Sequence, residues 1–142
     1  IKIILVMKAT VSRHAHFNAA HRLHVRDWSE EMNQDFFGLC NNNNFHGHNY
    51  ELIVSIKGEI DPVTGYVFDM KELSNIIKIN VENRLDHKNL NLDVPAFKSL
   101  NPSAENIAMV IYGWLKPCFS SDKDLKIRLY ETPRNYVDFG DD

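Results

Sequence analysis

Three histidines of this chain lie in two stretches whose alternate positions are mostly apolar. The even positions of residues 46–56 read His, His, Tyr, Leu, Val and Ile, and the odd positions of residues 15–21 read Ala, Phe, Ala and His. Because successive side chains of a strand point to opposite faces, His21, His46 and His48 share a face with residues that a core would bury. Three imidazoles that leave a fourth position open are typical of a catalytic zinc site rather than a structural one.

A second histidine pair is predicted to lie on the surface. His14 and His16 alternate with the apolar positions and share their face with Ser12 and Asn18. That face is polar, so these two imidazoles are not expected to join the metal site.

Cys40 precedes His46 by six residues, in an Asn-rich segment that is expected to form a tightly shaped loop. Near a divalent cation or a protonated histidine, the pKa of a thiol falls and the thiol becomes a usable base or nucleophile. A fourth zinc ligand and a small buried hydrophobe are equally open interpretations of Cys40. Cys118, beside a proline at a helix end, is predicted only to pack.

Carboxylates supply the other candidates for chemistry. Asp86 and His87 follow a predicted helix and could act as an orienting carboxylate and a proton-transfer imidazole, although adjacent residues rarely point at one another. Glu131 continues the parity of the apolar positions 125, 127 and 129, and a carboxylate on an apolar face is costly unless it is paired or meets a ligand. Glu105 lies in the first turn of its helix, and the helix dipole explains it adequately.

The elements that must position these side chains follow from periodicity and turn chemistry. Long strands are predicted over about 8–23, 46–59 and 125–131, with a short last strand over 136–139. Turn residues at 61–65 predict a hairpin into an extended run at 66–68. Helices are predicted over 69–85 and 103–117, with a helical turn near 28–34. The order indicates an α+β fold, an antiparallel sheet with two helices on one face.

Composition sets the outer limits. The 142 residues suit one domain, 1–142, and 44% hydrophobic with 25% charged residues is ordinary for a globular protein. A net charge of −3 gives no footprint for nucleic acid. The opening run 1–7 is far below the about 18 residues of a membrane span. Met7 is interpreted as the natural start, with residues 1–6 coming from upstream sequence or from a non-native addition. Two widely separated cysteines favour a reducing, cytoplasmic compartment.

Taken in order, the motifs resemble the 6-pyruvoyltetrahydropterin synthase family over roughly residues 12–139. The matching stretches are 17–23 (FNAAHRL), 36–42 (FFGLCNN), 46–50 (HGHNY), 58–65 (GEIDPVTG), 85–90 (LDHKNL), 103–106 (SAEN) and 130–132 (YET). The family also contains 6-carboxytetrahydropterin synthase of the deazapurine pathway, whose cysteine usually lies four residues before the HGH histidine. In this chain Cys40 lies six residues before His46, and this spacing resembles the pyruvoyl branch of the family.

The resemblance implies a tunnelling fold, with a four-stranded antiparallel sheet and two helices, assembled as an oligomeric barrel of stacked trimers, a homohexamer. It implies that His21, His46 and His48 hold Zn²⁺ and that Cys40, Asp86 and His87 transfer protons, the last two from a neighbouring subunit. The resemblance also implies that Glu131 anchors the pterin and that Glu105 contacts the substrate. Which cations meet the triphosphate is not readable; Arg22 and Arg26 are candidates.

The implied reaction converts 7,8-dihydroneopterin triphosphate to 6-pyruvoyltetrahydropterin with elimination of triphosphate, a carbon–oxygen lyase step of tetrahydrobiopterin biosynthesis. Leu39, Ala104 and the segment 43–45 depart from the family pattern and bear on how the side chain or triphosphate is held. Three alternatives remain: 6-carboxytetrahydropterin synthase, side-chain cleavage of dihydroneopterin, and a non-catalytic binding protein that zinc only stabilises, with Cys40 as fourth ligand.

Overall fold

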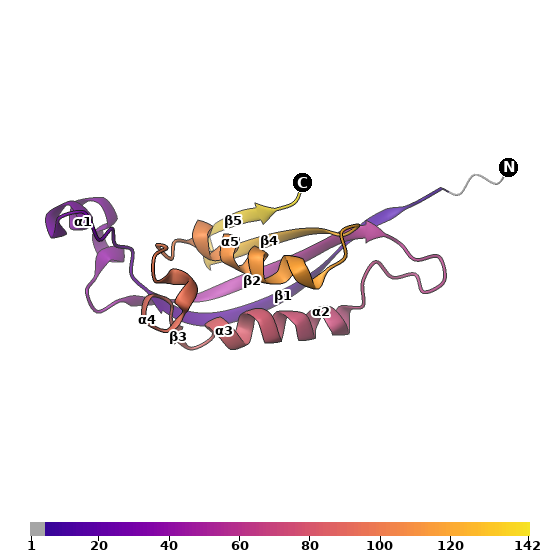
Figure 1. Ribbon diagram of the computed structural model, residues 1–142, viewed down its shortest axis with the longest axis horizontal. Coiled ribbons are helices and arrows are strands. Elements are labelled where there is room, and N and C mark those ends of the chain that lie inside the picture. Colours follow the sequence, from indigo (N-terminus) through magenta and orange to yellow (C-terminus); the bar gives the residue numbers. More distant parts are fainter. Residues whose placement is uncertain (1–4) are drawn as a thin grey trace.

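Figure 1 shows the computed structural model, which describes residues 5–142. Most of the segment 1–6 therefore lies outside the described residues, and the choice of Met7 as natural start stays a prediction. No helix in the part of the chain that the structure describes is both long and apolar enough to cross a membrane.

Two long antiparallel strands form the centre of the sheet. Strand β1 (Lys8–His21) pairs along its whole length with β2 (His46–Glu59), and β2 pairs on its other side with β4 (Asp124–Thr132). Strand β5 (Asn135–Gly140) extends the antiparallel order beyond β4. The long strands follow the predicted alternation, although β1 ends at His21 rather than at residue 23.

The sheet has one strand more than the four antiparallel strands that were predicted. A fifth, two-residue strand, β3 (Lys88–Asn89), runs parallel to β1 and pairs with Ala19 and Ala20, so the order is β3-β1-β2-β4-β5 and the sheet is mixed. Two residues carry no periodicity, so no sequence pattern could reveal this strand. The extended run predicted at 66–68 is also wrong, because these residues form a bend that leads into the next helix.

The helices begin where capping residues predict. Asp69 caps α2 (Met70–Ile77), which continues through a π-helical turn (Lys78–Glu82) into α3 (Asn83–Leu85). Ser103 caps α5 (Ala104–Leu115) by accepting a hydrogen bond from the backbone N–H of Asn106. The remaining helices are short: α1 (Glu30–Phe37), which is longer than the helical turn expected near 28–34, and α4 (Leu90–Asp93).

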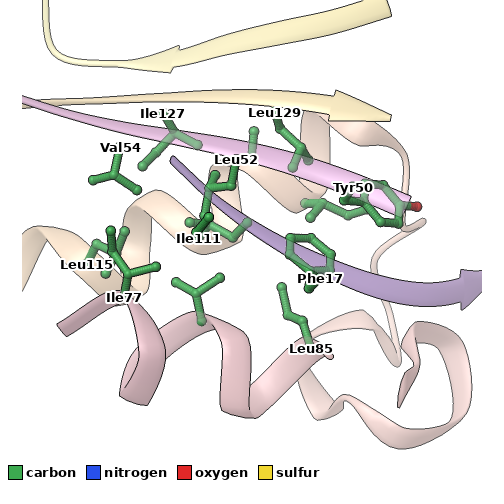
Figure 2. Packing of buried hydrophobic residues seen from close by; sticks show 14 of the residues in the cluster. Phe17, Tyr50, Leu52, Val54, Ile77, Leu85, Ile111, Leu115, Ile127 and Leu129 are labelled. Carbon is green, nitrogen blue, oxygen red and sulfur yellow. The ribbon is translucent and has the colours of Figure 1, made fainter. Parts of the chain in front are cut away.

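One face of the sheet carries the hydrophobic core. In Figure 2 the inward side chains of β1, β2 and β4 meet those of α2, α3 and α5, with Phe17 and Tyr50 at the end of the core nearer the close of β1. The opposite face is polar along β1, where His14 and His16 are exposed as predicted. The histidine-bearing ends of β1 and β2 therefore continue the row of buried side chains, and this row positions the candidate site.

Candidate metal and substrate site

The register of β1 and β2 brings the three predicted histidines together. His21 lies directly opposite His46, and His48 lies opposite Ala19, whose small side chain leaves room for the imidazole. The three ring centroids are 4.6 to 5.0 Å apart. One nitrogen from each ring lies within 4.8 Å of the others, so this group could hold a metal ion.

The nitrogens that meet have no hydrogen-bond partner in the described part of the chain. Nε2 of His21, Nδ1 of His46 and Nε2 of His48 are buried and make no hydrogen bond within the described residues. Buried polar atoms normally are satisfied, so three orphaned nitrogens at one point indicate a missing ligand. A metal ion fits this donor set, because neutral imidazole nitrogen is a common ligand for Zn²⁺ and related ions.

His21 is held in the form that a metal ligand needs. Its Nδ1 lies 2.7 Å from the carbonyl oxygen of Pro102, just before α5, and donates to it. With the proton on Nδ1, the lone pair of Nε2 faces the other two rings. Burial is the main cause that lowers the pKa of His21 to about 4, and the neighbouring His46 and His48 lower it further. Burial also lowers the pKa of His46. Both effects favour neutral imidazoles.

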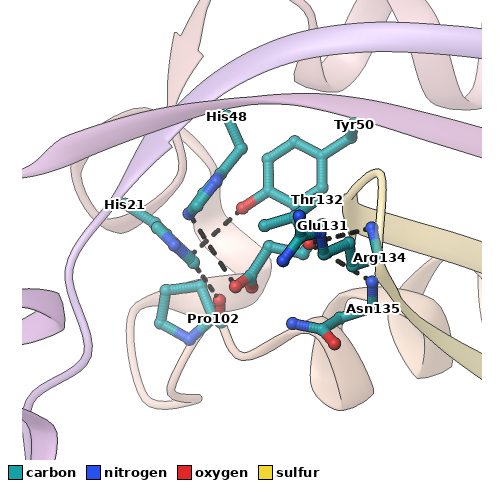
Figure 3. A network of polar contacts seen from close by, with 8 residues as sticks. All are labelled: His21, His48, Tyr50, Pro102, Glu131, Thr132, Arg134 and Asn135. Atoms are coloured by element: carbon teal, nitrogen blue, oxygen red, sulfur yellow. Dashed lines mark hydrogen bonds and ion pairs between the residues drawn. The ribbon is translucent and has the colours of Figure 1, made fainter.

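Glu131 lies beside the histidines, as its parity predicted. Its Oε1 is 3.8 Å from Nε2 of His48 (Figure 3). The pairing of β4 with β5 shifts between Tyr130 and Thr132, so Glu131 has no partner on β5 and occupies a bulge. Bulges re-aim side chains next to active sites. The turn that follows is fixed because Oγ1 of Thr132 accepts hydrogen bonds from the next two backbone N–H groups along the turn, those of residues 134 and 135.

A groove of about 600 Å³ opens beside Glu131 and His48. It extends over the edge of β2 that β4 no longer pairs, lined there by Gly47 and Asn49. It then continues onto the polar face of the sheet, where its lining includes His14, Glu51 and Ile53. This volume suits a small bicyclic ligand with a polar side chain, since small-molecule sites are typically about 300–1,000 Å³.

Tyr50 also belongs to this site, although it was not among the residues predicted to do chemistry. It is completely buried, and its hydroxyl lies 3.3 Å from Nδ1 of His21. Burial is the main cause that raises the pKa of Tyr50, and the nearby charges of Glu131 and Cys40 raise it further, so the hydroxyl stays protonated. The signal was present in the sequence, because Tyr50 has the same parity as His48.

Cys40 lies near the histidines but outside the metal-binding group. Its thiol is not among the ligand atoms that come together in the described part of the chain, which argues against the interpretation as fourth ligand. The backbone carbonyl of Cys40 accepts from the N–H of Leu23, and the side chain of the next residue, Asn41, donates to the Leu23 carbonyl. These bonds hold the cysteine loop against the chain that leaves β1.

Arg22 also holds this loop. Its guanidinium donates to the carbonyl oxygen of Asn41 and to the side-chain oxygen of Asn43, at 3.0 and 2.7 Å. Arg22 therefore has a structural role here, and a contact of its side chain with the triphosphate stays a prediction. The other candidate, Arg26, is exposed.

Asp86 and His87 point at one another, contrary to the expectation for adjacent residues. Oδ2 of Asp86 lies 2.9 Å from Nδ1 of His87, while Oδ1 of Asp86 accepts from the backbone N–H of Asn18. The hydrogen bond from the backbone N–H of Asn18 is the main cause that lowers the pKa of Asp86, and the contact with His87 lowers it further. His87 has a φ of 60°, and we attribute the approach of its ring to the preceding carboxylate to this left-handed backbone.

The Asp86–His87 pair is separate from the histidines within one chain. Among residues 5–142, no hydrogen bond or ion pair connects it to His21, His46 or His48. Its imidazole side chain is 83% exposed, so it is free to meet another surface.

Two remaining candidates lie at the surface. Glu105 is exposed in the first turn of α5, three residues after Pro102, and a role in ligand binding stays a prediction. Cys118 was expected to pack, but it is exposed, and it ends a 3₁₀ turn, Lys116–Cys118, that contains no buried residue. Both cysteines are free thiols.

Together these features define an α+β protein in which three histidines that could hold a metal ion lie beside a carboxylate and a groove. The family model described as 6-pyruvoyl tetrahydropterin synthase matches residues 10–142, and the chain belongs to this family.

Known proteins extend the likeness over nearly the whole chain. It is 42% identical to 6-pyruvoyl tetrahydrobiopterin synthase of Homo sapiens over 130 residues, 92% of this chain and 90% of the relative. The structure of Caenorhabditis elegans 6-pyruvoyl tetrahydropterin synthase superposes with a TM-score of 0.91 at 36% identity, covering 99% of this chain and 100% of that one. Dihydroneopterin monophosphate aldolase of Pyrococcus furiosus is 33% identical over 120 residues, 84% of this chain and 86% of the relative.

Proposed function

We propose that this protein is a zinc-dependent lyase that converts 7,8-dihydroneopterin triphosphate to 6-pyruvoyltetrahydropterin and releases triphosphate, a step of tetrahydrobiopterin biosynthesis. The observation that carries the proposal is the set of three unpartnered histidine nitrogens beside Glu131, in a chain 42% identical to a named synthase. The reduced thiol that this chemistry needs at Cys40 favours a cytoplasmic location.

Zinc is the metal we assign to the histidine group. His21, His46 and His48 would hold it, with the Pro102 carbonyl fixing the proton of His21 on Nδ1. Bound there, zinc would polarise the side-chain hydroxyls of the substrate and acidify the adjacent C–H bonds.

The other residues divide the remaining work. Glu131 would accept hydrogen bonds from the paired N–H donors of the aminopyrimidinone edge, which a carboxylate matches in geometry and charge. Cys40, as thiolate, would remove a proton from the side chain, and the Asp86–His87 pair would return protons to the product. Glu105 would contact the substrate from the start of α5.

The reaction balances without a redox cofactor. The first side-chain carbon loses hydrogen and becomes a carbonyl, while the N5=C6 bond of the ring takes up the equivalent of that hydrogen. The C–O bond to the triphosphate breaks, the second hydroxyl carbon becomes a carbonyl, and the third carbon ends as a methyl group. Each step transfers protons, so correctly placed bases and acids are the main requirement.

We also propose that the protein is a homohexamer, a dimer of trimers forming a barrel, with each active site completed by a neighbour. Three features support this. Among residues 5–142, the Asp86–His87 pair makes no direct hydrogen bond or ion pair with the three histidines, although it is hydrogen-bonded to Asn18 of β1. The described sheet face away from the helices is polar and exposed, and β5 ends the sheet with Tyr136 49% exposed.

Mixed oligomers test the shared site. Cys40→Ala and His87→Ala each inactivate one part, so co-refolding the two inactive proteins should restore part of the activity if the parts come from different chains. A mixture that stays as inactive as its components would place both parts in one chain and overturn the shared site.

Product analysis tests the reaction. Zinc-loaded protein is given dihydroneopterin triphosphate, with and without a sepiapterin-type reductase and NADPH as a trap. Release of triphosphate with a trappable 6-pyruvoyl product supports the proposal. A 6-carboxy product with acetaldehyde would move the protein to the deazapurine branch, and no turnover would favour the zinc-stabilised binding protein.

A second candidate is side-chain cleavage, which the 33% identity to an aldolase favours. This reaction would break the bond between the first two side-chain carbons and release a two-carbon aldehyde, leaving a hydroxymethyl group on the ring. The same assay separates it, because the aldolase product retains one side-chain carbon and cannot be trapped by the reductase.

A further inference from the structure

Tyr50 has a hydroxyl in the site without a complete set of partners. Its ring is completely buried and stacks on Phe17 with 4.8 Å between the ring centroids, so packing fixes where the oxygen lies. Figure 3 shows this hydroxyl directed toward His21, in the same part of the site as His48 and Glu131. The centroid of its ring is 5.5 Å from that of His48.

The hydroxyl hydrogen of Tyr50 has no acceptor among the described residues. Nδ1 of His21 lies 2.7 Å from the Pro102 carbonyl oxygen, which can only accept, so Nδ1 must carry the hydrogen. The Tyr50 oxygen lies 3.3 Å from the same nitrogen. Because that nitrogen carries a hydrogen, the Tyr50 oxygen can only accept a hydrogen bond from it. A protonated phenol also carries one hydrogen to donate. Within residues 5–142, the hydroxyl makes no other hydrogen bond, so this hydrogen has no acceptor.

A buried donor without an acceptor costs free energy unless a ligand or an ordered water satisfies it. The ring edge of a pterin that faces a carboxylate presents N–H donors, so it offers nothing that Tyr50 could donate to. The hydroxyl oxygens of the pterin side chain do have free lone pairs. In the proposed function these oxygens lie at the histidine cluster, the same place toward which Tyr50 points.

We propose that Tyr50 is a substrate-binding residue whose hydroxyl donates a hydrogen bond to a side-chain oxygen of the bound pterin. The ligand class rests on the proposed function, whereas the spare donor rests on the contacts of His21, Pro102 and Tyr50 alone. Tyr50 thereby distinguishes pterins with a hydroxylated side chain from those without one.

The test compares two probes on the zinc-loaded protein and on Tyr50→Phe. Neopterin carries the hydroxylated side chain, and pterin has the same ring without it. Phe keeps the ring that stacks on Phe17, so the fold should persist, which near-ultraviolet circular dichroism checks. We expect Tyr50→Phe to weaken neopterin binding roughly three- to tenfold and to leave pterin binding and zinc stoichiometry unchanged. Calorimetric titration measures the affinities.

Four results would overturn the assignment. Equal losses for both probes, or no loss for neopterin, would show that the hydroxyl does not meet the side chain. Loss of zinc from Tyr50→Phe would show that Tyr50 only supports His21. A variant with 4-aminophenylalanine at position 50 keeps an N–H donor in the same place and should retain the preference for neopterin; loss of that preference would contradict the proposal even if Tyr50→Phe failed to fold.

The proposed function can fail separately. Wild-type protein that binds neither probe would reject the pterin ligand class and the role of Tyr50 with it. Wild-type protein that binds both probes, with no selective change in Tyr50→Phe, would reject only the role of Tyr50.

Discussion

Nδ1 of His21 donates to the carbonyl oxygen of Pro102 across 2.7 Å, joining the end of β1 to the segment that starts α5. This contact links two parts of the chain 81 residues apart and sets which nitrogen of the imidazole is free. The start of α5, where Glu105 lies, is thereby tied to the three-histidine group. The orientation of the His21 imidazole therefore depends on tertiary packing as well as on strand register.

Replacing a histidine of the cluster should remove the metal. His48→Ala leaves only two of the three unpartnered nitrogens, and two imidazoles hold zinc far less tightly than three. We expect stoichiometric zinc in the wild type and loss of zinc from His48→Ala after dialysis, measured by atomic emission. His14→Ala, which removes an exposed imidazole from the polar face of β1, is the matched control and should retain zinc. Full occupancy in His48→Ala would refute the three-histidine site.

Removing the thiol should affect turnover but not metal. Cys40→Ala should retain stoichiometric zinc, because the thiol lies outside the group of converging ligand atoms, while turnover falls on the order of 10²-fold or more through loss of the base. Cys118→Ala removes the other, exposed thiol and should change neither quantity. If zinc leaves together with the Cys40 thiol, the residue is a ligand and the assignment as base is wrong.

Period-two alternation was sufficient to predict most of the site. It placed His21, His46, His48 and Glu131 on the buried face, and a β-sheet with that face covered brings all four to one end. The helix caps at Asp69 and Ser103 were equally readable, because capping is a local interaction.

Features that depend on distant contacts could not be predicted in this way. The Pro102 carbonyl has no side-chain signature, and the two residues of β3 pair only because the chain passes beside β1. The left-handed backbone of His87 is rare for a non-glycine residue, so the contact with Asp86 ran against the general expectation. The alternation of β2 places Tyr50 on the same face as His48, but its role follows from the hydrogen bonds around Nδ1 of His21.

Asp141 should stabilise the fold in a pH-dependent manner. Its carboxylate accepts from the backbone N–H of Leu125 at 2.9 Å and from Lys116 and Tyr112, both at 2.5 Å, which ties the end of β5 to α5 and β4. The backbone bond from Leu125 is the main cause that lowers the pKa of Asp141 to about 2.

Because this folded-state pKa lies below the unfolded value of about 3.9, the stabilisation is complete above pH of about 4 and is lost as the pH falls toward 2. Asp141→Asn should lower the free energy of unfolding at pH 7 by about 1–2 kcal/mol, measured by urea denaturation. It should also flatten the loss of stability between pH 4 and 2. Asp142→Asn, the same change at the exposed neighbour, should be close to neutral. Equal effects at the two positions would show that net charge, not these contacts, is responsible.

Neutralising the carboxylate of the site should weaken substrate recognition without releasing the metal. Glu131→Gln keeps the shape of the side chain but removes the charge that would accept the N–H donors of the pterin, and charge-assisted hydrogen bonds are about twice as strong as neutral ones. We expect kcat/KM to fall about ten- to hundredfold, mostly through KM, with zinc retained because Glu131 lies 3.8 Å from His48 and is not one of the converging ligands. Glu59→Gln, an exposed glutamate at the other end of β2, is the control for net charge and should have wild-type kinetics. An unchanged KM in Glu131→Gln would mean that the bulge aims this carboxylate at something other than the substrate.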